Sequence, residues 1–389
     1  MSATATIIAL PAVDGSFRRV ELREPTALAT SSTPATSRVA FAAGHVVADP
    51  LRSSVGSPTQ IDWDATLGIR HRLWDLGLGI AESMDTAQRG MGIAPAVALE
   101  LGRRTIAEAA ARGAEVVVGI ATDALDAGER DLSAITDAYL EQLTEIEGAG
   151  GRVVLMASRQ LAAAAAGPDD YLRVYGDVLR AAHRPVVLHW LGEMFDPALA
   201  GYWGSTDLAA ATETVHTLID EHAERIDGLK MSLLDEAHEV AFRRRLPSGV
   251  RPYTGDDFNY VPLIAGDELG HSDALLGAFS AVPRFASAAL AALDADDAAG
   301  FRAILGPTQE LSRLIFEAPT QYYKVGVVWL SYLTGWQSHF RMIGGFETGR
   351  SLLHLARVFE SANAIGLFED PERAAARASG YFRGVGVDG

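Results

Sequence analysis

The sequence predicts an α/β fold, a (β/α)8 TIM barrel with a helical C-terminal extension. Eight apolar, strand-like segments between residues 38 and 280 alternate with segments that have the pattern of amphipathic helices. This alternation is typical of parallel strands that are covered by helices on both faces of the sheet. Eight such units in about 250 residues favour a closed barrel over an open doubly wound sheet. No Gly-x-Gly-x-x-Gly or P-loop sequence follows any strand, which argues against a nucleotide-binding sheet.

The expected strands are short and rich in valine, isoleucine, leucine and alanine. They cover residues 38–43, 78–81, 115–120, 151–156, 185–189, 226–232, 250–254 and 275–280. The expected helices between them begin at or near a capping or turn residue, such as Asp62. They cover residues 63–76, 95–112, 132–147, 169–182, 208–223, 236–246 and 261–269.

Three regions follow from this pattern. Residues 1–37, with a stretch rich in serine, threonine, proline and alanine at 26–37, are expected to be an N-terminal arm or linker. Residues 38–285 form the barrel, and residues 286–389 form a helical C-terminal region because the strand signals stop after Pro283. Its helices are expected at 284–296, 299–317, 320–334 and 346–363, and its aromatic residues are expected to pack on the barrel or to form a subunit interface.

Composition limits the classes of function. The net charge is −17, from 33 basic and 50 acidic side chains, so the chain has no basic surplus for nucleic acid. It has no cysteine, which excludes disulfides and thiolate sites. No apolar run approaches the ~20 residues that a transmembrane helix needs, and no signal peptide is evident. We therefore expect a cytoplasmic protein that has no membrane segment and does not bind nucleic acid.

The strand at residues 226–232 is unusual because a lysine, Lys230, lies near its middle. A buried ammonium group is costly, so burial lowers the pKa of a lysine and favours the neutral amine. A neutral amine is a nucleophile towards carbonyl carbon, as Schiff-base chemistry requires. The alternative is a lysine at a strand end, with its head in solvent or paired to Asp235 or Glu236.

Other chemically capable residues fall where the strands end, which is where TIM barrels have their active sites. Taken one at a time they have structural interpretations, as core histidines, helix caps or turn residues. Their convergence on one rim favours a site. They are His45 after the first strand, Ser83, Asp85 and Thr86 after the second, Ser158 after the fourth, His189 and Trp190 on the fifth, and Asp256 and Asp257 after the seventh.

The order of these segments resembles the dihydrodipicolinate synthase / N-acetylneuraminate lyase family of class I Schiff-base aldolases, over roughly residues 38–340. Lys230, in Asp227-Gly228-Leu229-Lys230, stands where that family has its Schiff-base lysine. Three further segments carry the resemblance: Gly255-Asp256-Asp257, the eighth-strand segment 277–283 with Phe279, and the segment 319–326 in the helical tail.

The resemblance implies a carbon–carbon or carbon–oxygen lyase of the aldolase type. It implies a Schiff base between Lys230 and a keto acid or related carbonyl substrate, a homo-oligomer (dimer or tetramer), and no cofactor. His189 stands where the family has a tyrosine, and we expect it to move protons because its ordinary pKa is near neutrality. Ser83, Asp85 and Thr86 are expected to orient the polar end of the substrate, with Ser158, Trp190, Asp256 and Phe279 as further substrate-binding residues.

Two segments differ from the family pattern. The loop at residues 82–86 differs from the one that binds the pyruvyl carboxylate, and Glu193-Met194-Phe195 stand where synthases have an arginine. These differences indicate a substrate other than that of dihydrodipicolinate synthesis, and Asp85 favours a hydroxylated or neutral one.

Two other classes of function stay open at this point. One is a metal-dependent barrel lyase or hydrolase that uses His45, Asp85, His189 and Asp257, although no close spacing such as His-x-His supports it. The other is a non-catalytic barrel that binds a small ligand or serves as a scaffold.

Overall fold

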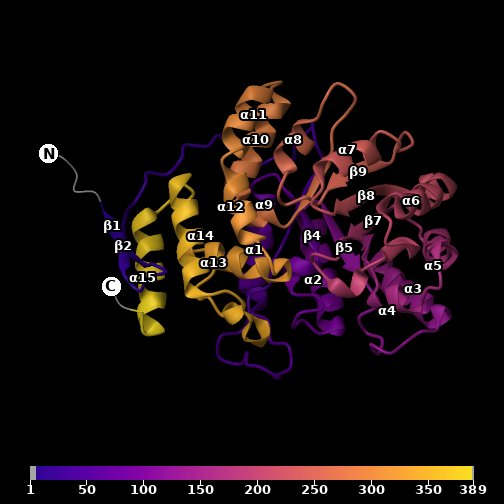
Figure 1. Ribbon diagram of the computed structural model, residues 1–389, viewed down its shortest axis with the longest axis horizontal. Helices are drawn as coiled ribbons and strands as arrows, with labels where there is room; N and C mark the ends of the chain where they lie inside the picture. The colour runs from indigo at the N-terminus through magenta and orange to yellow at the C-terminus, as the bar shows by residue number, and fades with distance from the viewer. Residues whose placement is uncertain (1–5, 388–389) are drawn as a thin grey trace.

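The computed structural model, which describes residues 6–387, contains one closed barrel of eight parallel strands (Figure 1). The strands follow one another around the barrel in chain order, and the last pairs with the first. The TIM barrel predicted from the sequence is therefore confirmed. The strands are β3 (Ala40–Ala43), β4 (Gly79–Glu82), β5 (Val116–Ile120), β6 (Arg152–Leu155), β7 (Val186–Leu191), β8 (Ile226–Ser232), β9 (Arg251–Thr254) and β10 (Asp273–Leu276).

Helices surround this barrel, and several begin at an aspartate that caps them. Asp62 accepts a hydrogen bond from the Ala65 backbone N–H, and Asp131, Asp207 and Asp235 cap their helices in the same way. Such caps satisfy backbone donors that have no partner inside the helix. The helices are α1 (Trp63–Trp74), α2 (Pro95–Arg112), α3 (Leu132–Gly148), α4 (Arg159–Ala164), α5 (Pro168–Ala181), α6 (Leu208–His222), α7 (Glu236–Arg243) and α8 (Tyr260–Ala265).

Side chains alternate between the inside of the barrel and the helical layer. Val117, Val154, Val187 and Tyr253 belong to one buried apolar cluster that fills the barrel. Their strand neighbours, such as Leu188, belong to the larger cluster between the strands and the helices. Because successive side chains on a strand point to opposite faces, His189, two positions after Val187, also points into the barrel.

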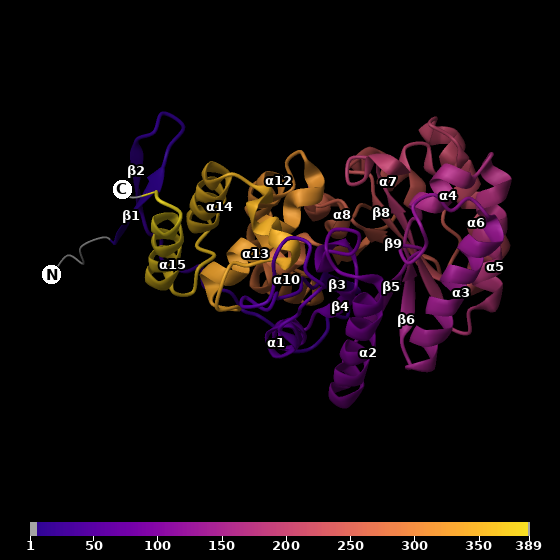
Figure 2. The same ribbon diagram turned by 90° about the horizontal axis from the view of Figure 1, so that it is seen from below.

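The helical C-terminal region is also confirmed. Its helices lie side by side at one end of the molecule, next to the barrel (Figures 1 and 2). The first of them, α9, follows β10 directly, and α13 packs against α9. They are α9 (Ala278–Ala281), α10 (Pro283–Asp294), α11 (Ala298–Leu305), α12 (Thr308–Ile315), α13 (Tyr323–Thr334), α14 (Leu352–Ala364) and α15 (Pro371–Gly384).

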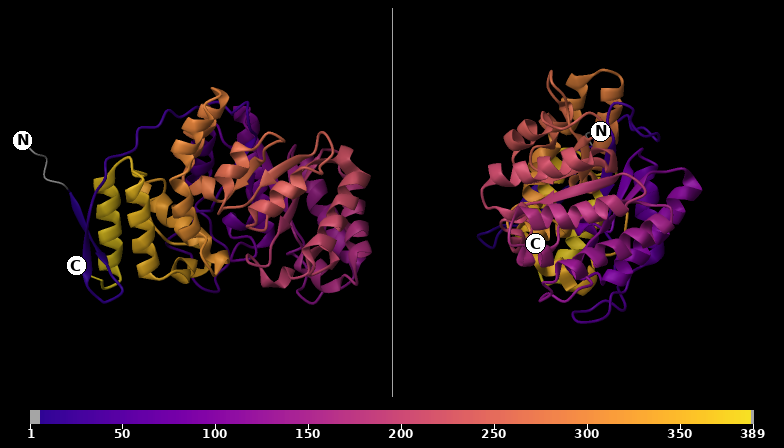
Figure 3. Two further views of the ribbon diagram at one scale, coloured as in Figure 1. Left: turned by 45° about the horizontal axis from the view of Figure 1, so that its top comes forward. Right: turned by 90° about the vertical axis from the view of Figure 1, so that its right-hand side faces the viewer.

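The N-terminal arm contains an antiparallel hairpin, β1 (Ile7–Pro11) with β2 (Phe17–Glu21). This hairpin lies against α14 and α15, beside the far end of the chain (Figures 2 and 3). The Arg23 backbone N–H donates to Asn363 Oδ1 at 3.0 Å, which ties the arm to α14. Residues 1–5 of the expected arm lie outside the described part of the chain.

Three details differ from the sequence-based expectation. The strand expected at 275–280 ends at Leu276, because the chain turns at Gly277 into α9. The first backbone N–H of α9, at Ala278, donates a hydrogen bond to Asp257. The helix expected at 346–363 begins only at Leu352, after the 3-10 segment η6 (Ile343–Gly349). Helix α15 was not expected at all. No helix within residues 6–387 is long and apolar enough to cross a membrane.

Candidate active site

Lys230 lies inside the barrel. Strand pairing aligns it with His189 on β7 and with Tyr253 on β9, and Tyr253 belongs to the interior cluster. Residues that pair across neighbouring parallel strands point to the same face, so the Lys230 side chain points inward. Only 8% of Lys230 is exposed, and its amine makes no hydrogen bond to any residue between 6 and 387.

The environment of Lys230 lowers its pKa. Burial is the main cause, and the nearby carboxyl groups of Asp85 and Asp257 oppose it. Gly255, on the neighbouring chain segment, makes room for the lysine: a Cβ there would lie 2.7 Å from Lys230 Cε and 2.2 Å from Ser232 Oγ. The amine is therefore desolvated, shifted towards its neutral form and flanked by two acids.

Asp257 is one of these two acids. It follows β9, and its Oδ1 accepts a 2.8 Å hydrogen bond from the Ala278 backbone N–H at the start of α9. Burial raises the pKa of Asp257 to about 7, while the charge of Lys230 lowers it. A carboxyl group with that pKa can both donate and accept a proton at neutral pH.

Asp256, which the sequence placed among the substrate-binding residues, has a different position. Its Oδ1 accepts hydrogen bonds from the backbone N–H groups of Phe258 and Asn259, and its Oδ2 accepts one from the Asn259 side chain. These bonds close the turn after β9. Of the two adjacent aspartates, Asp257 therefore faces Lys230 and Asp256 shapes the loop.

Asp85 lies half-buried on a short 3-10 turn, η1 (Asp85–Ala87), after β4. Its charge raises the pKa of Lys230 and of a second buried lysine, Lys324 on α13. It also raises the pKa of Tyr323, after burial as the main cause. Asp85 therefore lies near all three groups, which is consistent with the sequence-based expectation that it belongs to the site.

Thr86 and Tyr323 form a buried pair of hydroxyl groups, 2.7 Å apart. Tyr323 begins α13, and its ring stacks on Phe316 with ring centres 4.3 Å apart. Burial, with the charges of Asp85 and Asp257, raises the pKa of Tyr323 well above its ordinary value. The C-terminal region thus supplies one wall of the barrel mouth.

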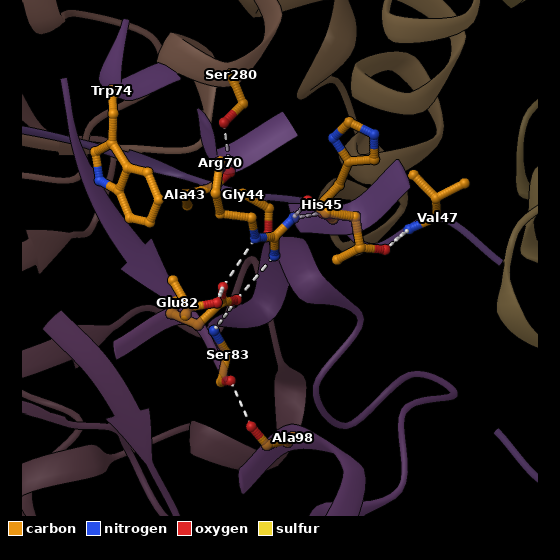
Figure 4. Close-up of polar contacts among 12 residues, drawn as sticks. Ala43, Gly44, His45, Val47, Arg70, Trp74, Glu82, Ser83, Ala98 and Ser280 are labelled. Atoms are coloured by element: carbon orange, nitrogen blue, oxygen red, sulfur yellow. Dashed lines mark hydrogen bonds and ion pairs between the residues drawn. The ribbon is translucent and has the colours of Figure 1, made fainter. Parts of the chain in front are cut away.

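A buried ion pair holds the segment that carries Asp85 and Thr86 (Figure 4). Arg70 on α1 and Glu82 on β4 are both fully buried and make two hydrogen bonds of 2.8 Å each. Glu82 also accepts from Thr105 Oγ1 at 2.6 Å and from the Ser83 backbone N–H at 2.7 Å. Arg70 donates further to the carbonyls of Gly44 and His45 after β3. This Arg70–Glu82 clamp joins the ends of the first two barrel strands.

Ser83 follows the clamp with a left-handed backbone, φ 54°. Its hydroxyl donates to the Ala98 carbonyl on α2 at 2.6 Å (Figure 4). The hydroxyl proton is therefore used to fix the turn that leads to Asp85, and we assign Ser83 to the shape of the loop.

His189 is fully buried beside Lys230. Its Nε2 lies 3.2 Å from Ser232 Oγ, and its Nδ1 has no hydrogen-bond partner in the described chain. Burial, and then the charge of Lys230, holds the pKa of His189 well below its ordinary value. The expectation that this histidine titrates near neutrality is therefore wrong, because the sequence pattern does not show how completely the ring is buried.

Three expected site residues are not brought to Lys230. Trp190 points out of the barrel, and its ring packs edge-on against Trp203 and Phe242. The alternation of side chains on β7 explains this, since His189 points inward. Phe279 lies on α9 and packs on Tyr260. Ser158 caps α4 through a hydrogen bond from the Leu161 N–H, and its hydroxyl is bonded to Thr122.

The four residues of the metal-site hypothesis do not form a group that could hold a metal ion. His45 is buried and hydrogen-bonded to Gln337 Oε1 at 2.7 Å, and burial lowers its pKa to about 4. Between residues 6 and 387, no three histidine, aspartate or glutamate side chains are placed to hold a metal ion. The geometry gives this hypothesis no support.

Two adjoining cavities open beside this group of residues. One, of about 660 Å³, lies over the ends of β4 to β7, and the other, of about 270 Å³, lies between η1 and the start of α13. Both are lined by Asp85, Arg89, Arg159 and Asp196. There is thus space for a small molecule next to Asp85.

Sequence reasoning missed the contributions of Tyr323 and Lys324. Both lie in the segment 319–326 that carried part of the resemblance, but nothing in the sequence gave them a role. The one available signal was a lysine within an otherwise apolar helix, at Lys324. Their positions depend on how α13 packs against the barrel, which a local pattern does not specify.

Comparison with known proteins gives one family and many structural neighbours. A family model described as "Protein of unknown function (DUF993)" matches residues 8–387. No curated protein matches the chain.

Among solved structures, YagE of E. coli K12, a prophage protein of the dihydrodipicolinic acid synthase family in complex with pyruvate, is 14% identical with a TM-score of 0.65. The alignment covers 85% of this chain and 99% of YagE. Dihydrodipicolinate synthase of Aquifex aeolicus is 15% identical with a TM-score of 0.64, covering 85% of this chain and 98% of the other. The enzyme of Oceanobacillus iheyensis is 14% identical with a TM-score of 0.63, covering 84% and 97%. Because the identities are this low, these structures confirm the resemblance inferred from the sequence at the level of the fold.

Proposed function

The chain belongs to the DUF993 family of proteins of unknown function, and we propose that it is a lyase of the aldolase type that forms a Schiff base through Lys230. One observation carries the proposal. A lysine on the inner face of the barrel is buried, has no hydrogen bond within the described chain and lies between two carboxyl groups. Such an amine is a ready nucleophile for a carbonyl carbon.

The proposed reaction begins with attack of the neutral Lys230 amine on the substrate carbonyl. The nitrogen lone pair forms the new C–N bond, and the carbonyl oxygen takes up a proton to give a carbinolamine. Loss of water then leaves an iminium ion. The positive nitrogen accepts the electron pair of a nearby C–C bond when that bond breaks, which gives an enamine; protonation and hydrolysis release the product and restore the lysine. Formation of the bond is the reverse of these steps.

Asp257 is the proposed general acid and base. It lies close enough to Lys230 for each to shift the pKa of the other. As a carboxylate it takes the proton that a substrate hydroxyl releases when the C–C bond breaks. As a neutral acid it gives a proton to the oxygen that leaves as water. The Thr86–Tyr323 hydroxyl pair, which lies near Asp85, is proposed to hydrogen-bond the substrate.

His189 has a different proposed role from the one expected. Because it stays neutral beside Lys230, it adds no second positive charge next to the iminium ion. Its buried Nδ1 has no partner in the described chain and is free to make one hydrogen bond. It is therefore proposed to orient the substrate or water.

The first substrates to test are small keto acids and related carbonyl compounds. The YagE protein was crystallised in complex with pyruvate, which makes pyruvate one member of the panel. A homo-oligomer, dimer or tetramer, is part of the proposal and is measured by sedimentation of the purified protein.

The test is reduction with borohydride in the presence of each candidate substrate, followed by peptide mass analysis. We expect an added mass on the peptide with Lys230 and none in the Lys230→Ala variant, which also loses turnover. Lys324 is the internal comparison, since it is a second buried lysine near Asp85. An adduct on Lys324 alone, or full turnover in Lys230→Ala, would contradict the assignment. No adduct with any carbonyl compound would favour the non-catalytic barrel.

A further inference from the structure

The smaller cavity is lined by cationic side chains that have no role in the proposed mechanism. It lies between the turn η1, the start of α13 and the segment 195–197, and its volume is about 270 Å³. Arg159 and Lys324 both line it. We propose that this cavity binds an anionic group, a carboxylate or a phosphate, at the far end of the substrate. The inference extends the proposed function, but binding of an anion can be measured without any turnover.

Lys324 is a buried cation with few partners. Only 3% of it is exposed, and its amine donates to the Gln321 backbone carbonyl at 3.0 Å and approaches the Met91 sulfur at 3.4 Å. It makes no ion pair within 4.0 Å among the described residues. A buried ammonium group without a close counter-ion is costly, and an anion in the adjoining cavity would provide one.

Arg159 faces the same space from α4. Its Nε is bonded to Asp196, which fixes the guanidinium group, while Nη1 and Nη2 have no hydrogen-bond partner in the described chain. These two nitrogens are the pair that forms parallel hydrogen bonds to a carboxylate or a phosphate. Gly90 leaves the space for them, because a Cβ there would lie 3.3 Å from Nη1 and 3.4 Å from Nη2.

The two cations are near enough to affect each other. The charge of Arg159 lowers the pKa of Lys324, and burial is the larger cause. Two positive groups that face one cavity with free N–H donors favour an anion between them. The other arginine of the cavity, Arg89, is already paired with Asp123 and Gln142. The recognition is therefore assigned to Arg159 and Lys324.

The position of Asp85 then defines the class of substrate. Asp85 lines the smaller cavity together with Lys324, and its charge also acts on Lys230. A molecule that reaches from the Lys230 amine to the cavity passes this carboxylate, which attracts a hydrogen-bond donor and repels a second anion. The structure thus assigns a carbonyl compound with a hydroxyl group in its middle and an acidic group at the opposite end.

The test is calorimetric titration of the full chain with succinate, inorganic phosphate and the neutral succinamide. We expect succinate or phosphate to bind and succinamide not to bind, and the tighter of the two anions identifies the group. Arg159→Gln and Lys324→Met should each weaken anion binding about tenfold or more. Arg173→Gln, at an exposed arginine on α5, should leave it unchanged.

Lys230→Ala separates this proposal from the proposed function. The Lys230→Ala protein should still bind the anion, because Lys230 does not line the smaller cavity. Equal binding of succinamide, or anion binding that survives both cavity variants, would overturn the inference. Anion binding lost only in Lys230→Ala would place the anion at the amine and overturn it as well. Absence of a borohydride adduct, with anion binding intact, would count against the Schiff base alone.

Discussion

At the scale of the residue, the two adjacent aspartates Asp256 and Asp257 have different roles because they bond to different backbone groups. Asp256 accepts three hydrogen bonds and closes a turn, whereas Asp257 accepts one and faces Lys230. Residue type and spacing predict that a carboxylate follows this strand, but they do not say which of the two turns inward. That choice follows from the start of α9, whose N–H holds Asp257.

The Asp257→Asn variant tests this assignment. The pKa of Asp257 is about 7, raised by burial, so its carboxylate form increases as the pH rises through 7. If the carboxylate accepts the substrate proton, kcat/KM of the wild type should rise with pH and level off above 7. The variant should lose about 10²- to 10⁴-fold in kcat and show no inflection near 7.

Asp256→Asn is the matched control for that experiment. Because Asp256 closes the turn and does not face Lys230, its variant should lose stability but keep the shape of the pH profile. An inflection near pH 7 that persists in Asp257→Asn, or that disappears in Asp256→Asn, would assign the titrating group elsewhere.

At the scale of the element, the Arg70–Glu82 clamp determines how two strands present the loop with Asp85. It joins α1, α2 and the ends of β3 and β4 through six hydrogen bonds to buried partners (Figure 4). Removing one partner leaves the other charge buried and alone. Glu82→Gln or Arg70→Met should therefore lower the free energy of unfolding by about 3–5 kcal/mol, measured by urea denaturation.

The double variant Arg70→Met/Glu82→Leu is the control for that loss. It removes both charges at once, so it should be more stable than the sum of the two single changes predicts. A double variant as unstable as that sum would show that the two side chains act independently of one another.

Elements with a regular pattern were predictable, and those that depend on distant packing were not. Helix α2 runs from Pro95 to Arg112 and strand β8 from Ile226 to Ser232, both as expected, because proline at a helix start and a bounded apolar run are local signals. The strand β2 is mostly exposed and polar, and α15 is rich in alanine and arginine. Each is stabilised by contacts between the two ends of the chain, and a pattern read from a short stretch of sequence does not include such contacts.

At the scale of the whole molecule, the site is made by the barrel and the C-terminal region together. Lys230 and Asp257 come from the barrel, whereas Tyr323 and Lys324 come from α13. The barrel and the buried lysine on its inner face could be predicted because each has a signal within a single segment. The second half of the site could not, since it depends on the docking of a helix about a hundred residues further along.

Stability of the whole fold should depend on pH through Glu239, which lies on α7 and makes no hydrogen bond to Lys230 or Asp257. It is buried and accepts hydrogen bonds from Thr254 at 3.0 Å and Ser272 at 2.7 Å. Burial raises its pKa to about 8 from an ordinary 4.5. An acid whose pKa is raised by folding gives its full stability below the unfolded pKa and loses it as the pH rises to the folded value.

The wild type should therefore lose stability relative to Glu239→Gln between pH 4.5 and pH 8, by up to about 1.4 kcal/mol per pH unit, because glutamine cannot ionise. Urea denaturation at pH 5, 7 and 9 measures the difference. Glu236→Gln, on the exposed face of the same helix, should show no such trend. A difference between wild type and Glu239→Gln that stays constant over this range would mean that Glu239 ionises in the folded protein as easily as in the unfolded chain.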